Sequence, residues 1–132
     1  MPLSKSGFTL IELLVIVSII ALLAVLSTTY TQSAKIKAKN VSFQSTANSV
    51  KNAIGICCSG GTGTINTVLG QDMCTPASGS IYPTGANLGS VEVIRGCSDV
   101  QGYSVKLTPG TSNAATMNHA LCDRDSCDFI PN

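Results

Sequence analysis

The sequence lacks the residue patterns that mark most enzymes and most nucleic-acid-binding proteins. It has a single histidine, His119, and no G-x-S-x-G motif, phosphate-binding loop or pair of acids that we can place as catalytic. Charged residues make up only 11% of the chain and the net charge is +1, so electrostatics give no general case for nucleic acid as a partner. We therefore expect a protein that is not an enzyme and that does not bind nucleic acid.

Acidic residues are absent from positions 27–54, and this absence divides the chain. The lysines of that stretch give it a charge of +4, whereas the remainder, from Gly55 onward, has a charge of −3 and holds eleven of the twelve glycines. A chain of 132 residues has room for one small domain and little more. We therefore place a single boundary near Gly55.

Cysteine is absent before Gly55, and the six cysteines of the chain all follow it: Cys57, Cys58, Cys74, Cys97, Cys122 and Cys127. Six cysteines in a segment rich in glycine, serine and threonine predict disulfides formed in an oxidising compartment. Free buried thiols would suit a richer core, and zinc is disfavoured because the sequence has no C-x-x-C pair and one histidine. Adjacent cysteines rarely bond to each other, so we expect Cys57 and Cys58 each to reach Cys74 or Cys97, in an order left open.

One long apolar run, Phe8 to Leu26, is present near the N-terminus and is interrupted only by Thr9, Glu12 and Ser18. As a helix this run would rise about 28 Å, close to the ~30 Å hydrocarbon core of a bilayer. A secretory signal has a shorter apolar region, with its cleavage site after that region. A plain membrane anchor or signal would gain by losing Glu12, because a charge in mid-membrane costs about 2.5–3.5 kcal/mol. Glu12 therefore indicates a function with a charged partner.

Residues 5–25, KSGFTLIELLVIVSIIALLAV, resemble the N-terminal segment shared by type IV pilins and type II secretion pseudopilins. The resemblance implies that a membrane peptidase, the prepilin peptidase, cuts after Gly7 and methylates the new amino terminus at Phe8. Residues 1–7 would then be a short basic leader left on the cytoplasmic side. Glu12 matches the acid of the family, which pairs with the Phe8 amine of a neighbouring subunit and sets the register of assembly.

The resemblance also implies an α+β, pilin-like fold and a structural role. A long helix over 8–54, with 8–26 as transmembrane segment and filament core, would carry a small disulfide-stabilised head with an antiparallel sheet over 55–132. Such a subunit starts in the inner membrane, with its head in the periplasm or outside, and then joins identical or related subunits in an extracellular pilus. Two alternatives are a type II secretion pseudopilin and a membrane-anchored, disulfide-rich binding module. Many family members have a proline where this chain has Leu-Ser-Thr-Thr at 26–29, so their helix kink does not carry over.

Periodicity within the second half of the predicted helix supports this division. Apolar residues spaced for one helical face predict a stripe that packs under the head: Ile36, Phe43, Ala47, Val50 and Ile54. Gly55 is expected to end the helix. We interpret Lys35, Lys37 and Lys39 as a solvated face, with anionic lipid headgroups or the acidic heads of neighbouring subunits as alternative partners.

Alternating apolar and polar residues predict strands in the head. Segments 91–95 and 103–107 are expected to form a β-hairpin, 116–121 a third strand, and 55–89 a long loop pinned by cysteines. By resemblance to the C-terminal loop of type IV pilins, Cys122 is expected to bond to Cys127. Some pseudopilins hold calcium near the C-terminus, but Asp123, Asp125 and Asp128 lack the glycine and glutamate of an EF-hand loop. We expect a solvated acidic loop there, and no cofactor.

Overall fold

The structure is a computed structural model that describes residues 7–84, 87–111 and 116–132, with the side chains of 27–29 left out. The predicted leader therefore lies outside the described residues, apart from Gly7. The described residues form one helix and six strands: α1 Leu10–Cys58, β1 Thr64–Ile65, β2 Cys74–Thr75, β3 Ser90–Arg95, β4 Ser104–Thr108, β5 Met117–Asp123 and β6 Cys127–Pro131. This is the expected α+β layout of one long helix and a head with an antiparallel sheet.

The chain divides into two compact units, residues 1–35 and 36–132. The first unit contains the N-terminal part of α1, which consists mainly of leucine, isoleucine and valine. Every side chain from Phe8 to Leu26 is exposed. By length and composition, α1 could cross a membrane. A helix that is apolar all round needs either lipid or other helices around it, so this unit is incomplete in water.

The second unit is built on the predicted apolar stripe of α1. Phe43, Ala47, Val50 and Ile54 are all buried, as expected. Ile36 is 39% exposed, so its prediction as a core residue was wrong. The reason is that, in the described part of the head, the hydrogen bond to α1 nearest the N-terminus lies about one turn later, where the Thr116 hydroxyl donates to Asn40 Oδ1 at 2.8 Å.

The C-terminal end of α1 lies beyond the expected position. The helix continues through Gly55 and ends at Cys58. Tyr103 is buried and donates its hydroxyl to the Lys51 carbonyl oxygen at 2.8 Å, and disulfides hold Cys57 and Cys58. These tertiary bonds outweigh the cost of a glycine in a helix, which is only about 1 kcal/mol relative to alanine.

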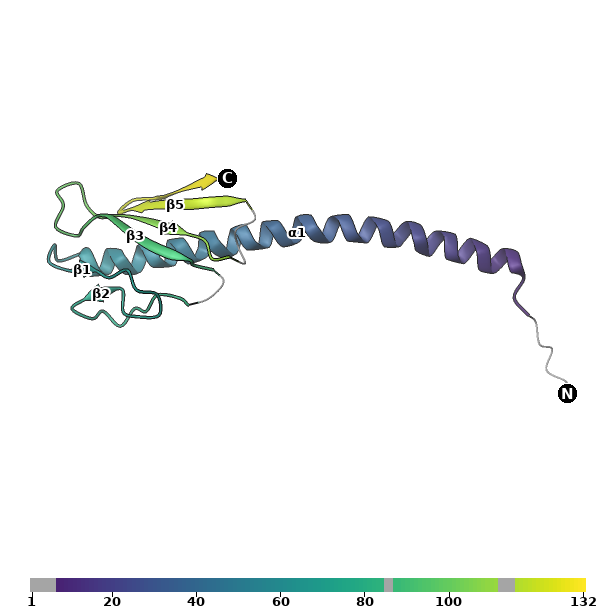
Figure 1. The fold of residues 1–132 in the computed structure, drawn as a ribbon, viewed down its shortest axis with the longest axis horizontal. Helices are drawn as coiled ribbons and strands as arrows, with labels where there is room; N and C mark the ends of the chain where they lie inside the picture. The colour runs from purple at the N-terminus through teal and green to yellow at the C-terminus, as the bar shows by residue number, and fades with distance from the viewer. Residues whose placement is uncertain (1–6, 85–86, 112–115) are drawn as a thin grey trace. The chain divides into compact units, whose positions relative to one another are not determined.

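The main sheet has the strand order β3-β4-β5-β6, and all its neighbours are antiparallel. The expected hairpin and third strand are confirmed, while β6 was not predicted. In the register, Val91 is opposite Leu107, and Val105 is opposite Cys122. These residues are buried and form one core with the stripe of α1, and Figure 1 shows the strands lying along that part of the helix.

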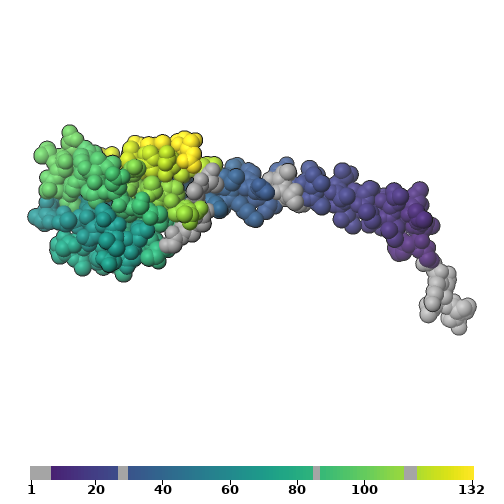
Figure 2. All heavy atoms as spheres, in the orientation of Figure 1, coloured from purple at the N-terminus to yellow at the C-terminus, as the bar shows by residue number. Residues whose placement is uncertain are grey.

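The segment between α1 and β3 is more ordered than a simple loop. It contains the two-stranded antiparallel sheet β1-β2, an isolated bridge between Asp72 and Ile81, and the buried side chains of Tyr82 and Leu88. Tyr82 donates its hydroxyl to the Asn66 carbonyl oxygen at 2.8 Å. Figure 2 shows this segment, in teal, packed with the green and yellow strands into one head.

Candidate assembly segment and the bonds of the head

The residues predicted to direct assembly lie at the start of α1. Phe8 is 78% exposed and precedes the helix, and Glu12 lies in the first turn. The Thr9 amide and the Thr9 hydroxyl donate to Glu12 Oε2 at 3.0 and 2.9 Å. Threonine followed three residues later by glutamate is the sequence pattern of a capping box, and the bond from the Thr9 amide to the Glu12 carboxylate is the glutamate half of such a box, which helps the helix to begin here. Glu12 thus caps its own helix, and the two Thr9 donors approach the same carboxylate oxygen.

The apolar side chains around Glu12 are not covered by the described residues of the first unit. The leucines, isoleucines and valines are between 48% and 83% exposed from Leu10 to Leu26. Burying one such side chain is worth about 1.5–3 kcal/mol relative to leaving it in water. The arrangement can therefore insert into lipid or associate with other apolar helices.

The lysines of α1 differ from one another in their surroundings. Lys35, Lys37 and Lys39 are exposed, and the ion pair found among the described residues is instead Lys106 with Glu92, at 3.3 Å. The Lys51 Nζ donates a hydrogen bond to the Asp125 carbonyl oxygen at 3.0 Å and so connects α1 to the β5–β6 turn. This fastening role of Lys51 was not predicted, because it depends on a residue 74 positions away.

All six cysteines lie within the described residues, and all are paired. Cys57 is bonded to Cys74, Cys58 to Cys97, and Cys122 to Cys127, with Cα–Cα distances of 5.9, 4.8 and 4.0 Å. The order that the sequence left open is therefore Cys57 with Cys74 and Cys58 with Cys97. Cys122 and Cys127 are opposite each other in the β5–β6 register, which is the pair that the resemblance implies.

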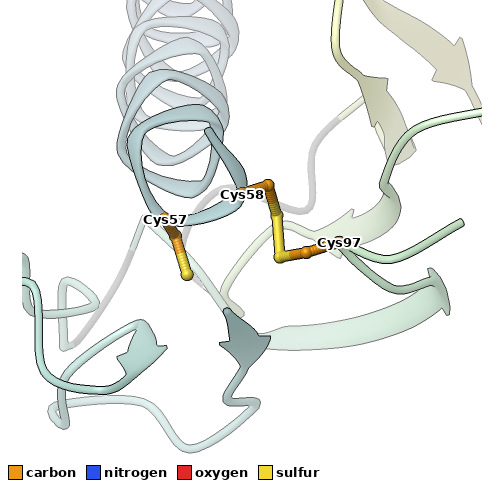
Figure 3. A group of neighbouring side chains, drawn as sticks. All are labelled: Cys57, Cys58 and Cys97. Atoms are coloured by element: carbon orange, nitrogen blue, oxygen red, sulfur yellow. A yellow bond between two sulfur atoms is a disulfide. The ribbon is translucent and has the colours of Figure 1, made fainter. Parts of the chain in front are cut away.

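Among the described residues, one group of potential soft-metal ligands comes together. The sulfur atoms of Cys57, Cys58 and Cys97 all lie within 4.8 Å of one another, and Figure 3 shows this group at the end of α1. Each of these sulfurs already belongs to a disulfide, so none is a thiolate that could bind zinc.

The acidic C-terminal loop is organised by Asp123. Its Oδ1 accepts hydrogen bonds from the backbone amides of Asp125 and Ser126, both at 2.8 Å, and these bonds lower the pKa of the Asp123 carboxyl. Asp125 and Asp128 are exposed. Asp123 therefore shapes the turn between β5 and β6, while His119 lies half-buried on β5.

Asp72 is a structural residue that sequence reasoning missed. Its carboxylate accepts from the amides of Cys74, Ser78 and Gly79 at 2.8–3.0 Å and from the Ser78 hydroxyl at 3.2 Å. Hydrogen bonds from the Ser78 and Cys74 amides are the main reason that the pKa of Asp72 is lowered. The available signal was an aspartate followed by a cluster of proline, serine and glycine, which is typical of such side-chain-to-backbone turns.

Comparisons with known proteins identify the family of this chain. The model of the prokaryotic N-terminal methylation motif matches residues 3–28. Two curated relatives, both named "Probable minor fimbrial protein" and both from Dichelobacter nodosus, are 32% and 33% identical over 115 residues, or 86% of this chain and 71% of theirs. No solved structure matches. With its capped apolar helix and disulfide-bonded antiparallel head, the chain belongs to the family of type IV pilin-like fimbrial proteins that have the N-terminal methylation motif.

Proposed function

We propose that this pilin-like chain is processed at the Gly7–Phe8 bond by a prepilin peptidase, N-methylated at Phe8, and polymerised through α1 into a type IV pilus. The carrying observation is the first part of α1, which is apolar and exposed on all sides except for one acid in its first turn. Before assembly the inner membrane covers this surface, and in the filament other α1 helices cover it. The head then lies in the periplasm or outside, where its disulfides are stable.

Cleavage after Gly7 creates the charged amine at Phe8, and the local bonds of Glu12 leave its carboxylate able to accept from that amine. In the uncut chain the carboxylate is already stabilised by Thr9, through Oε2. A carboxylate has about four acceptor sites, so Oε1 can accept a further bond from the cationic Phe8 amine of a neighbour. Two unit charges 4 Å apart attract by about 4 kcal/mol at an effective dielectric near 20. Desolvation offsets part of this attraction, so the pair sets register more than it adds affinity.

The names of the two relatives, both described as minor fimbrial proteins, favour a minor subunit over a major one. In this role the chain is structural and not an enzyme, and its partners are other pilin subunits, with the peptidase as a transient partner. Its acidic head makes it a poor receptor for DNA, because DNA binding needs a basic surface.

Mass spectrometry of filaments sheared from the source cells tests this proposal. We expect peptides of this chain that begin at N-methylated Phe8, at a small fraction of the amount of the main subunit. Processed chain found only in the membrane fraction would instead favour a pseudopilin of a type II secretion system. An uncut Gly7–Phe8 bond in mature material would overturn the filament proposal itself.

A further inference from the structure

We propose that Cys57, Cys58 and Cys97 form a thiol–disulfide exchange site, at which an external thiolate can make Cys97 change its partner from Cys58 to Cys57. The observation is that the sulfur atoms of these three residues all lie within 4.8 Å of one another, although they belong to two different disulfides. This inference concerns the head alone, so it does not rest on pilus assembly.

The position of the two helical cysteines brings the disulfides together. Cys57 and Cys58 are consecutive residues in the last turn of α1, and Figure 3 shows Cys58 bonded to Cys97 beside the Cys57 side chain. Exchange needs a thiolate to reach a disulfide sulfur, and the three sulfurs already lie within 4.8 Å of one another. Cys122 and Cys127 do not belong to this cluster.

Accessibility decides where an external thiolate would enter. Cys57 and Cys58 are half-buried, whereas Cys74 and Cys97 are buried. A hollow of about 280 Å³ is lined by Cys58 and Cys97 and also by Tyr103, Asp99 and Arg124. The hollow therefore gives access to the Cys58–Cys97 bond, and one residue of each charge, Arg124 and Asp99, lines it.

The exchange balances without a net oxidant or reductant. The external thiolate attacks the Cys58 sulfur, forms a mixed disulfide and releases the Cys97 thiolate. The Cys97 sulfur then attacks the Cys57 sulfur, so that the Cys57–Cys97 bond forms, the Cys57–Cys74 bond breaks and Cys74 leaves as a thiolate. Cys74 can expel the external thiolate from Cys58 and form a Cys58–Cys74 bond. The substrate class is thus a thiolate, such as that of a thiol–disulfide isomerase, which is regenerated at the end.

The variant Cys74→Ser tests whether Cys97 can change its partner from Cys58 to Cys57, because it leaves Cys57 as an odd thiol beside the intact Cys58–Cys97 bond. The full chain in detergent would be held at pH 8, quenched with acid and alkylated, and fragmentation would locate the label. We expect roughly a tenth or more of the label on Cys58, because attack of the Cys57 thiolate on the Cys97 sulfur frees the Cys58 thiol. A label found only on Cys57 would overturn the proposal.

The variant Cys127→Ser is the matched control, because it also creates one odd thiol but outside the cluster. We expect its label to stay on Cys122, with both other disulfides unchanged. A label that spread equally from Cys122 to Cys57 or Cys58 would show exchange by general unfolding, and the proposal would then be wrong.

A second measurement covers the case in which Cys74→Ser does not fold. The unmodified full chain would be incubated at pH 8 with millimolar reduced glutathione, quenched and mapped. We expect Cys57 bonded to Cys97 as the main new pairing, while Cys122 stays bonded to Cys127. The absence of that new pairing, with glutathione attached at Cys58, would refute a cluster that exchanges internally.

Discussion

The Glu12 carboxylate bonds within its own helix, and under the proposed function it also pairs with the Phe8 amine of a neighbouring subunit. It accepts two hydrogen bonds from Thr9 and so begins α1, and it is the one charged residue between Phe8 and Tyr30. A lipid-facing acid needs partners, and the local bonds supply some before any neighbour is present. The capping bonds are therefore what we expect to stabilise the chain while it waits in the membrane.

Replacing Glu12 by Ala should abolish entry into filaments while the chain stays in the membrane fraction. We expect the amount in sheared filaments to fall at least tenfold, which corresponds to about 1.4 kcal/mol. The measurement is the ratio of filament to membrane material by quantitative mass spectrometry. Glu12→Gln is the control, since it keeps an acceptor for Thr9 but removes the charge. Normal assembly of the Gln variant would assign the role to capping and contradict the charge pair.

Asp72 makes a prediction for acid solution. Its pKa is lowered in the folded head by hydrogen bonds, so it contributes stability above its unfolded pKa and loses that contribution as pH falls through the folded value. Asp72→Ala should lower the thermal midpoint at pH 7, and the difference should be smaller at pH 2, because protonation removes the contribution of the ionised carboxylate. Thermal unfolding followed by circular dichroism at both pH values measures this. Asp128→Ala, at an exposed position, should change little at either pH.

At the scale of elements, α1 and the sheet are fastened to each other at identifiable points. Thr116 contacts Asn40 near one end of the sheet, and Tyr103 and the Asp125 carbonyl hold Lys51 near the other. Between these points the contact is apolar, through the stripe of α1 and the inner face of β4 and β5. Hydrogen bonds therefore fix the position of a sheet that burial alone would leave free to slide.

Removing the hydroxyl in Tyr103→Phe should destabilise the head by about 1 kcal/mol, the usual net value of one buried hydrogen bond. Urea unfolding at pH 7 measures this loss. Burial, and then the charges of Asp123 and Asp125, raise the pKa of Tyr103, so the native chain should lose stability as pH rises past about 10. The variant lacks this contribution, and its stability should fall less steeply there. Equal slopes for both proteins would contradict a buried hydroxyl.

Sequence periodicity predicts the elements whose residues repeat regularly. The stripe of α1, the β3–β4 hairpin and β5 all follow from apolar spacing. Strand β6 has no such alternation, and its pairing with β5 is supported by the Cys122–Cys127 bond and the turn that Asp123 organises. The two-residue strands β1 and β2 are too short to leave a period.

The functional and structural residues also fall into those that a local sequence pattern predicts and those that it does not. Gly7, Phe8 and Glu12 lie close together in the sequence, so one local motif predicts all three. The bond between Tyr103 and Lys51 joins residues 52 positions apart, and a contact between such distant residues leaves no local pattern. Asp72 differs, because its partners lie within the same loop and its local signal, the following cluster of proline, serine and glycine, was available but not used.

At the scale of the whole molecule, disulfides hold a head whose core is small. The bonded pairs are separated by 39 residues for Cys58–Cys97, 17 for Cys57–Cys74 and 5 for Cys122–Cys127. A crosslink restricts the unfolded chain more when the loop that it closes is longer. The bonds at the end of α1 should therefore contribute more than the C-terminal one.

Replacing each pair by alanines tests this order. From loop length alone we expect losses of about 4, 3 and 2 kcal/mol for Cys58–Cys97, Cys57–Cys74 and Cys122–Cys127 respectively. Guanidinium unfolding of the full chain in detergent, followed by tyrosine fluorescence, measures them. A largest loss at Cys122–Cys127 would show that packing of the buried Cys122, and not chain entropy, dominates.

The placing of these bonds has a mechanical consequence. A pull along α1 from its N-terminal side would load the head first at two side-chain hydrogen bonds, one between Asn40 and Thr116 and one between Ser42 and Asn87. Separation could then spread along the apolar contact, but it would stop at the last helical turn, where two covalent links hold the head. The weak fastening thus faces the load and the strong one lies at the far end. Under tension such a head can peel partly from its helix and close again, and it cannot be torn off.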